Sequence, residues 1–150
     1  MRRLLHMRLY VLGVLVLACP YLGCSGHSRP KTIGVEGHVT LAGKPVTQGT
    51  VIFQPTGHTE ASATHPASGQ IAADGTYRMS TFEKGDGVVP GEYRVAVQSI
   101  LLLPPQDKPW IPIVWAVPEK YVTSATSGLT ASIPADGPRQ HEINFELKSR

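Results

Sequence analysis

Three short turn motifs follow one another along the chain, and each lies beside segments in which apolar and polar residues alternate. They are Gly-Lys-Pro-Val at 43–46, Asp-Gly-Thr-Tyr at 74–77 and Pro-Gly-Glu-Tyr-Arg-Val at 90–95. Glycine, proline and aspartate favour tight turns, whereas a period of two places every second side chain on one face of a strand. The chain is therefore predicted to consist of short β-strands joined by turns, with alternate residues in a core.

Seven alternating segments are predicted as strands, and no helical pattern separates them. They are residues 35–41, 50–54, 70–73, 76–80, 91–97, 129–133 and 143–147. The 15 glycines and 13 prolines suit many turns and disfavour long helices. Residues 56–67, which follow Pro55, show no period and are predicted to be a mobile surface loop. This pattern predicts an all-β fold, a seven-stranded antiparallel β-sandwich.

The first 23 residues have the pattern of a bacterial secretory signal. Residues 1–8 carry three arginines and no acid, and a mostly apolar run over 9–18 follows. This run is too short to span a bilayer as a permanent helix. We predict a lipoprotein-type signal peptide over 1–23, a flexible polar tether over 24–33 and one domain over 34–150. A buried helix of the domain is the alternative interpretation of the apolar run.

Both cysteines follow the apolar run, and each is preceded by a small residue, as in the lipobox of bacterial lipoproteins. Cys24 precedes the small residues Ser25 and Gly26, whereas Pro20 directly after Cys19 would hinder processing. We favour Cys24 as the lipidated residue, with Cys19 as the alternative. Acyl chains would anchor the protein because each buried methylene is worth about 0.8 kcal/mol. The predicted location is a bacterial cell membrane, on its periplasmic or outer face; ordinary secretion is the alternative.

The net positive charge of the chain comes from the predicted signal peptide. Arg2, Arg3 and Arg8 account for three of the 14 basic side chains, so 11 remain to balance the 11 acidic ones. A nucleic-acid-binding protein would show a clustered basic stripe with aromatic residues among it, and this pattern is missing from the sequence. We therefore expect no nucleic-acid partner.

The order of the motifs resembles the carboxypeptidase regulatory-like, or transthyretin-like (prealbumin-like), domain family. The resemblance consists of Gly-x-Val-x-x-x-Gly-Lys-Pro-Val at 37–46, Val-x-Phe at 51–53, and the motifs at 74–77 and 90–95. The closing part of the chain is similar to small predicted lipoproteins of planctomycete-type bacteria. The resemblance covers residues 34–147 and implies a transthyretin-like sandwich that serves as a stalk, spacer or binding module without catalysis.

No catalytic group can be assembled from the sequence. Ser80, Ser99 and Ser127 lack the context of a nucleophile elbow. A relative of the transthyretin fold hydrolyses 5-hydroxyisourate, but its family ends in Tyr-Arg-Gly-Ser, whereas this chain ends in Glu-Leu-Lys-Ser-Arg at 146–150. We predict a protein that is not an enzyme.

Metal-ligating residue types occur without a recognisable ligand spacing. His58 and His65 are predicted to be solvated loop residues, and Asp74, Glu83 and Asp86 to belong to turns or to line one end of the sandwich. A transition-metal site on the histidines and a calcium-type site on the carboxylates are minor alternatives. His38 and His141 occupy polar strand positions and are expected to point outward. We predict no metal and no other cofactor.

Residues 100–118 are the most unusual segment, with both tryptophans, five prolines and almost no charge. This proline density disfavours a central strand or helix and favours extended structure. In one interpretation the segment is an apolar docking loop, with Trp110 and Trp115 as anchors for a protein or a sugar ring. In the other, it folds back and caps the sandwich. The predicted function is a lipid-anchored structural or protein-interaction module of the envelope; the alternative is a small carbohydrate- or ligand-binding domain.

Overall fold

The computed structural model describes residues 29–57, 65–108, 110–136 and 138–149, and this part of the chain is all-β. The signal peptide predicted over 1–23, both cysteines and His58 lie outside the described residues. The elements are β1 (Gly34–Leu41), β2 (Lys44–Pro45), β3 (Gly49–Pro55), β4 (Ala67–Ile71), β5 (Thr76–Arg78), β6 (Gly91–Gln98), β7 (Ile100–Leu102), β8 (Val114–Trp115), the 3-10 turn η1 (Glu119–Tyr121), β9 (Leu129–Ile133), β10 (Gln140–Glu142) and β11 (Phe145–Leu147).

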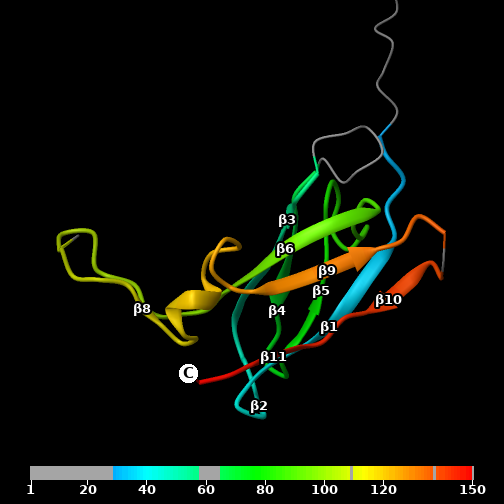
Figure 1. The fold of residues 1–150 in the computed structure, drawn as a ribbon. Helices are drawn as coiled ribbons and strands as arrows, with labels where there is room; N and C mark the ends of the chain where they lie inside the picture. The colour runs from blue at the N-terminus through cyan, green and yellow to red at the C-terminus, as the bar shows by residue number, and fades with distance from the viewer. Residues whose placement is uncertain (1–28, 58–64, 109, 137, 150) are drawn as a thin grey trace, which may run out of the picture.

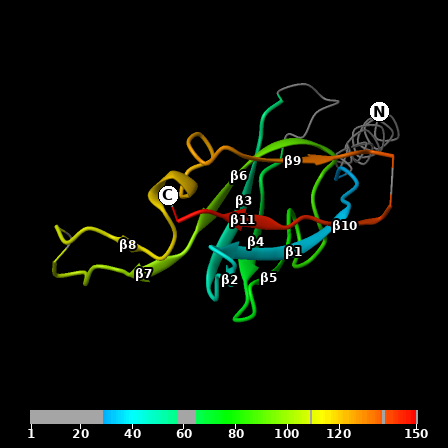
Figure 2. The same cartoon turned by 60° about the horizontal axis from the view of Figure 1, so that its bottom comes forward.

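Nine of the strands form one curled sheet, and the other two form a separate ribbon. The sheet has the order β10-β1-β5-β4-β3-β6-β9, and β2 and β11 also pair with β1. Figures 1 and 2 show the sheet curling into a body, with the ribbon of β7 and β8 projecting from one end. The continuous path of the sheet contains seven strands, the predicted number, but two further strands pair with β1, so the prediction is confirmed in part.

The core follows the alternation of the sequence. Val51 and Phe53 on β3 are fully buried, as are Val95 and Val97 on β6. Four aromatic rings meet at the centre: the Phe53 ring lies 5.6 Å from Tyr93 and 6.1 Å from Phe145, and Tyr77 lies 6.1 Å from Phe145. The prediction that alternate residues of the strands enter a core is confirmed on β3, β5 and β6.

The expectation of purely antiparallel pairing is wrong at the end of the chain. After β9 the chain crosses to the opposite end of the strand order, where β10 and β11 pair with β1 in parallel. Gly34 lies opposite Gln140, and Val39 lies opposite Phe145. This crossing brings the Phe145 ring into the aromatic core. A local alternation of residues carries no information on which distant strand it will pair with.

The hairpin predicted at Asp74 is confirmed, with a longer first strand. β4 begins at Ala67, three residues before the predicted start and within the segment predicted as a loop. Gly75 has a φ of 87°, and the Thr76 amide donates to Asp74 Oδ1 at 3.0 Å. Glycine adopts this conformation without steric cost, so the dipeptide closes the turn.

Candidate functional site

The projecting ribbon, residues 99–116, is called the hairpin from here on. Ile100 faces Trp115 and Leu102 faces Val114, and the Ala116 amide donates to the Ser99 carbonyl at 2.7 Å. The described prolines of this segment, Pro104, Pro105 and Pro112, lie outside the paired residues, which explains why a short ladder forms despite them. The observed ribbon is peripheral, so the predicted absence of a central strand is confirmed.

Large apolar side chains of the hairpin face solvent on both sides. Leu101 is 67% exposed and Leu102 is 53% exposed, although successive residues of a strand point to opposite faces. Trp110 is 74% exposed. The remaining exposed large hydrophobics of the described chain also belong to the hairpin: Ile100, Leu103, Ile113 and Val114. A concentration of this kind is typical of an interaction site rather than of scattered surface residues.

The far turn of the hairpin is polar, in contrast to its arms. Gln106, Asp107 and Lys108 are exposed there, and the two charges balance. The Lys108 amide donates to the Pro105 carbonyl at 3.0 Å, and the Ile111 amide donates to the Lys108 carbonyl at 3.2 Å. The apolar arms therefore end in an ordered turn with one charge of each sign.

The two tryptophans have different environments. Trp115 is half-buried and packs against the core, whereas Trp110 extends into solvent. They do not form a shared platform. Of the segment 100–118, Val117 is part of the buried core, and Trp115 packs against it.

A pocket of about 240 Å³ lies at the base of the hairpin, and we call it the base pocket. Its walls include Leu41, Lys44, Val46, Ser99, Leu101 and Ala116. Ser99 is 1% exposed, and its Oγ has no hydrogen-bond partner among the described residues. A buried hydroxyl without a partner loses the hydrogen bonds that water would give it. Sequence reasoning missed this pocket because its walls come from three separate segments.

The carboxylates predicted to belong to turns do so. Asp74 accepts from the Thr76 hydroxyl and amide, and these hydrogen bonds lower the pKa of Asp74. Burial raises the pKa of Asp86, but hydrogen bonds from the Thr81, Phe82 and Glu83 amides outweigh it, so this pKa is lowered.

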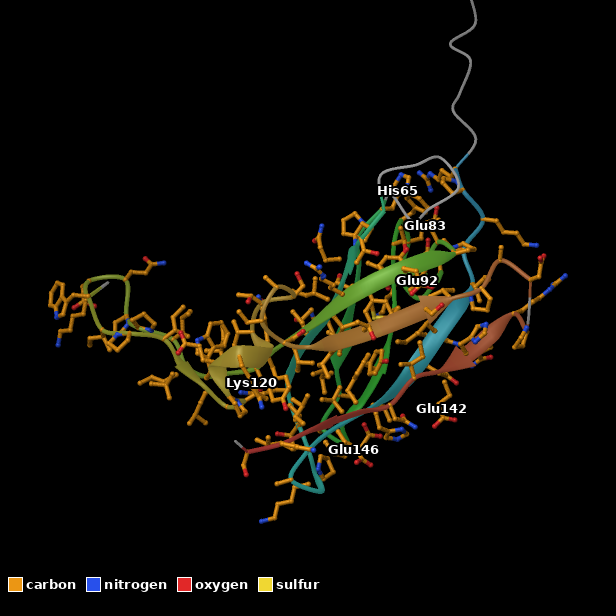
Figure 3. The ribbon with its side chains drawn as sticks, in the orientation of Figure 1. His65, Glu83, Glu92, Lys120, Glu142 and Glu146 are labelled. Atoms are coloured by element: carbon orange, nitrogen blue, oxygen red, sulfur yellow. The ribbon has the colours of Figure 1, made fainter. Side chains whose placement is uncertain are left out.

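The same carboxylates do not converge on a cation. Glu83 pairs with Arg29 at 2.8 Å, and this arginine also lies over the Phe82 ring. Figure 3 shows Glu83 beside His65, whose ring lies 5.0 Å from that of Phe82. Within residues 29–57, 65–108, 110–136 and 138–149, no group of three His, Cys, Asp or Glu side chains is arranged to hold a metal ion.

The other histidines and the serines have structural surroundings. His38 is exposed, as expected. His141 is half-buried and its Nε2 is covered, so the prediction that its side chain points outward is wrong in part. Ser80 Oγ accepts from the Gly85 amide at 2.8 Å, and Ser127 Oγ donates to the Val95 carbonyl. These serines therefore stabilise loops.

A second pocket, of about 350 Å³, lies at the opposite end of the body, where the described chain begins. Lys31, Ile33, Pro90 and Arg139 contribute to its walls. It has two basic residues and no buried polar group without a partner among the described residues that line it. The hairpin and its base pocket therefore form the candidate site.

In the part that the structure describes, no helix is long and apolar enough to cross a membrane. Comparison with protein-family models, with curated proteins and with solved structures finds no match to this chain.

Proposed function

We propose that this chain is an exported, lipid-anchored, non-catalytic module of the bacterial cell envelope, which binds a protein through its hairpin. In this proposal Cys24, or alternatively Cys19, carries the lipid. The body is a β-sandwich of the transthyretin-like type, which agrees with the order of the turn motifs and with the all-β architecture. The body acts as a rigid support, and the hairpin is the functional element.

The observation that carries this proposal is the exposure of the hairpin's leucines and Trp110. Burying one such side chain is worth about 1.5–3 kcal/mol, so covering several of them provides the free energy for a stable complex. The core of the body includes Phe53 and Tyr93 and contains no described residue of the arms and far turn over 100–114. A surface of this size is retained because a partner covers it.

The assignment as a non-catalytic module is supported by the partners of the reactive groups. Asp74 and Asp86 bind turn amides, and Ser127 binds a strand carbonyl. A nucleophile needs a base within hydrogen-bond reach. Each of these side chains already has a structural hydrogen bond that explains its position.

The anchor and the binding surface are tested separately. Intact mass of the protein from native membranes, with mapping of its N-terminal peptide, should show a diacylglyceryl adduct on Cys24; an unmodified N-terminus would refute the anchor. A photoreactive benzophenone amino acid in place of Leu102 should cross-link to a protein in intact cells, whereas the same group in place of the exposed Glu142 should not. Figure 3 shows Glu142 on the body, far from the hairpin. Absence of any protein product at Leu102 would refute the binding surface.

A carbohydrate ligand is the second candidate, favoured by the surroundings of Trp110. Its exposed indole shares a turn with Asp107 and Lys108, and this combination can stack on a sugar ring and bind its hydroxyls. Saturable quenching of tryptophan fluorescence by peptidoglycan fragments would support this candidate, provided that Trp110→Ala abolishes it. Unchanged quenching in Trp110→Ala would exclude it.

A further inference from the structure

We infer that the protein bound by the hairpin is a second copy of this chain, and that Trp110 of each copy enters the base pocket of the other. There, the indole N–H donates a hydrogen bond to Ser99 Oγ. This inference rests on the proposed function, namely that the hairpin binds a protein, and it names that partner.

The charged far turn of the hairpin argues against a lipid bilayer as the partner that covers the hairpin. A bilayer entered from the tip would first have to accept Asp107 and Lys108, which is costly in hydrocarbon. A lipid also provides no hydrogen bonds to the outer edges of β7 and β8, which pair with no other strand of the described chain. A second ribbon of the same kind can pair with one of these edges through its backbone.

A two-fold axis through the middle of the hairpin makes this contact reciprocal. Two hairpins lying side by side in opposite directions place each far turn at the base of the other, and such an interface uses the same surface on both copies. Trp110 lies in the far turn and Ser99 at the base. The arm that separates them, residues 99–105, can span at most roughly 20 Å at about 3.3 Å per residue.

The base pocket has the chemistry that an indole requires. Leu41, Val46 and Leu101 provide apolar walls around a volume of about 240 Å³. An indole has one polar atom, a donor N–H, and a serine hydroxyl can accept it. Ser99 Oγ is buried and without a hydrogen-bond partner among the described residues, so the contact would satisfy both groups.

The charges at the two ends of the hairpin are complementary in this arrangement. The far turn carries Asp107 and Lys108, whereas the base is surrounded by Lys44 on the pocket and by Glu119 and Lys120 of η1. Figure 3 shows Lys120 at the body end of the hairpin. Each end therefore offers the other both a cation and an anion, so no like-charge repulsion opposes this alignment.

The test uses the full chain in living bacteria. Two copies with different epitope tags are co-expressed, with a photoreactive benzophenone amino acid in place of Trp110 in one copy. Irradiation should give a product of twice the chain mass that carries both tags, with the attachment site within residues 41–48 or 99–116. Benzophenone in place of Glu142 is the matched control and should give no such product. A second copy and a membrane are present in any host, so this result does not depend on the native organism.

Two variants make the assignment specific. Leu102→Asp in both copies should lower the cross-linked yield at least about tenfold, because it places a charge between the ribbons. Ser99→Ala should lower it about threefold to tenfold, the usual effect of one neutral hydrogen bond. Cross-linking only to a different protein, or yields unchanged by both variants, would overturn the second copy but leave the proposed function in place. Cross-linking to lipid alone, or to nothing, would overturn both.

Discussion

Two tyrosines from the turn motifs close the core by directing their hydroxyls to backbone carbonyls. Tyr93 donates to the Val89 carbonyl and Tyr77 to the Ile143 carbonyl, each at 2.6 Å. Burial raises the pKa of Tyr93 to about 12 and raises that of Tyr77 well above its ordinary value. The period of two predicted that both rings point inward. It could not predict the acceptors, because a carbonyl's position depends on the fold around it.

The first prediction concerns the hydroxyl of Tyr93. Tyr93→Phe should destabilise the protein by about 1–2 kcal/mol, because the buried Val89 carbonyl loses its hydrogen bond. Tyr93→Ala or Phe145→Ala should cost about 3–5 kcal/mol, since either leaves a cavity among the central rings. Urea denaturation measures all three. A loss below 1 kcal/mol for the alanine variants would contradict the placement of these rings.

The second prediction follows from the pKa of Tyr93. Its unfolded value is 10.0 and its folded value is about 12, so the folded state retains the proton over this interval while the unfolded chain loses it. The contribution of Tyr93 to the free energy of unfolding is therefore constant below pH 10. Between pH 10 and 12 this contribution falls by about 1.4 kcal/mol per pH unit. Tyr77 acts in the same direction. Hydrogen bonding from the Lys148 amide lowers the pKa of Tyr121, so Tyr121 adds stability as the pH rises toward 10 and changes nothing further above it.

Comparison with Tyr93→Phe isolates this contribution. The unfolding free energies of the two proteins should converge as the pH rises from 9.5 to 11.5, because the variant has no phenol to titrate. Parallel curves over this range would contradict the assigned pKa.

At the scale of elements, β1 is the strand on which the fold depends. It pairs with β5 on one side and with β10 and β11 on the other. Between β10 and β11, Asn144 Oδ1 accepts from the His38 amide at 2.8 Å, and the Ile143 amide donates to the Glu36 carbonyl at 2.8 Å. The side chain of Asn144 thus replaces a backbone acceptor where the two short strands meet.

Gly37 leaves the space that this junction needs. It lies opposite Tyr77 in the ladder, and a Cβ built on Gly37 would stand 1.9 Å from the Ile143 carbonyl oxygen, the atom that accepts from the Tyr77 hydroxyl. The glycine of one motif and the tyrosine of the next are therefore parts of one contact. The sequence contains both residues, but their dependence on Ile143, 66 positions from Tyr77 and further still from Gly37, arises only when the strands pair.

The third prediction tests this contact. Gly37→Ala should destabilise the protein by about 2–4 kcal/mol, because the added methyl displaces backbone atoms and breaks the Tyr77 hydrogen bond. Gly43→Ala is the matched control: its φ of 79° makes alanine strained, but no atom lies within 4 Å of the added Cβ. It should cost only about 1 kcal/mol. Equal losses on thermal or urea unfolding would show that Gly37 matters only as a flexible residue.

The fourth prediction treats the hairpin as a removable element. Ile100 and Trp115 face each other, so an Asn-Gly turn can replace residues 101–114 and join them directly. The unfolding free energy should change by less than about 1 kcal/mol, because the removed side chains are mostly exposed and Trp115 stays on the core. Cooperative denaturation with an unchanged midpoint is the expected result. A shift of several kcal/mol would mean that the hairpin stabilises the body.

For the whole molecule, the sequence was informative about local pattern and much less so about assembly. Alternation and turn chemistry identified seven strands: β1, β3, β4, β5, β6, β9 and β11. The same alternation agrees with the buried rings of Phe53, Tyr77 and Tyr93. The apolar, proline-rich composition of residues 100–118 singled out the segment that forms the hairpin. The parallel pairing of β1 and the base pocket could not be predicted, since each unites segments that share no local signal.

The final prediction depends on where the hairpin and the first described residues lie. Figures 1 and 2 both show the start of the described chain, in blue, at one end of the body and the hairpin at the other. If Cys24 is anchored, the five residues up to Arg29 allow a reach of at most about 17–18 Å, so the hairpin should point away from the membrane. In vesicles that contain the lipidated protein and brominated phospholipids, Trp110 fluorescence should therefore not be quenched; Trp115→Phe leaves Trp110 as the only tryptophan. Strong quenching by the bromolipids would place the hairpin on the membrane and contradict both the opposed ends and the pairing of hairpins.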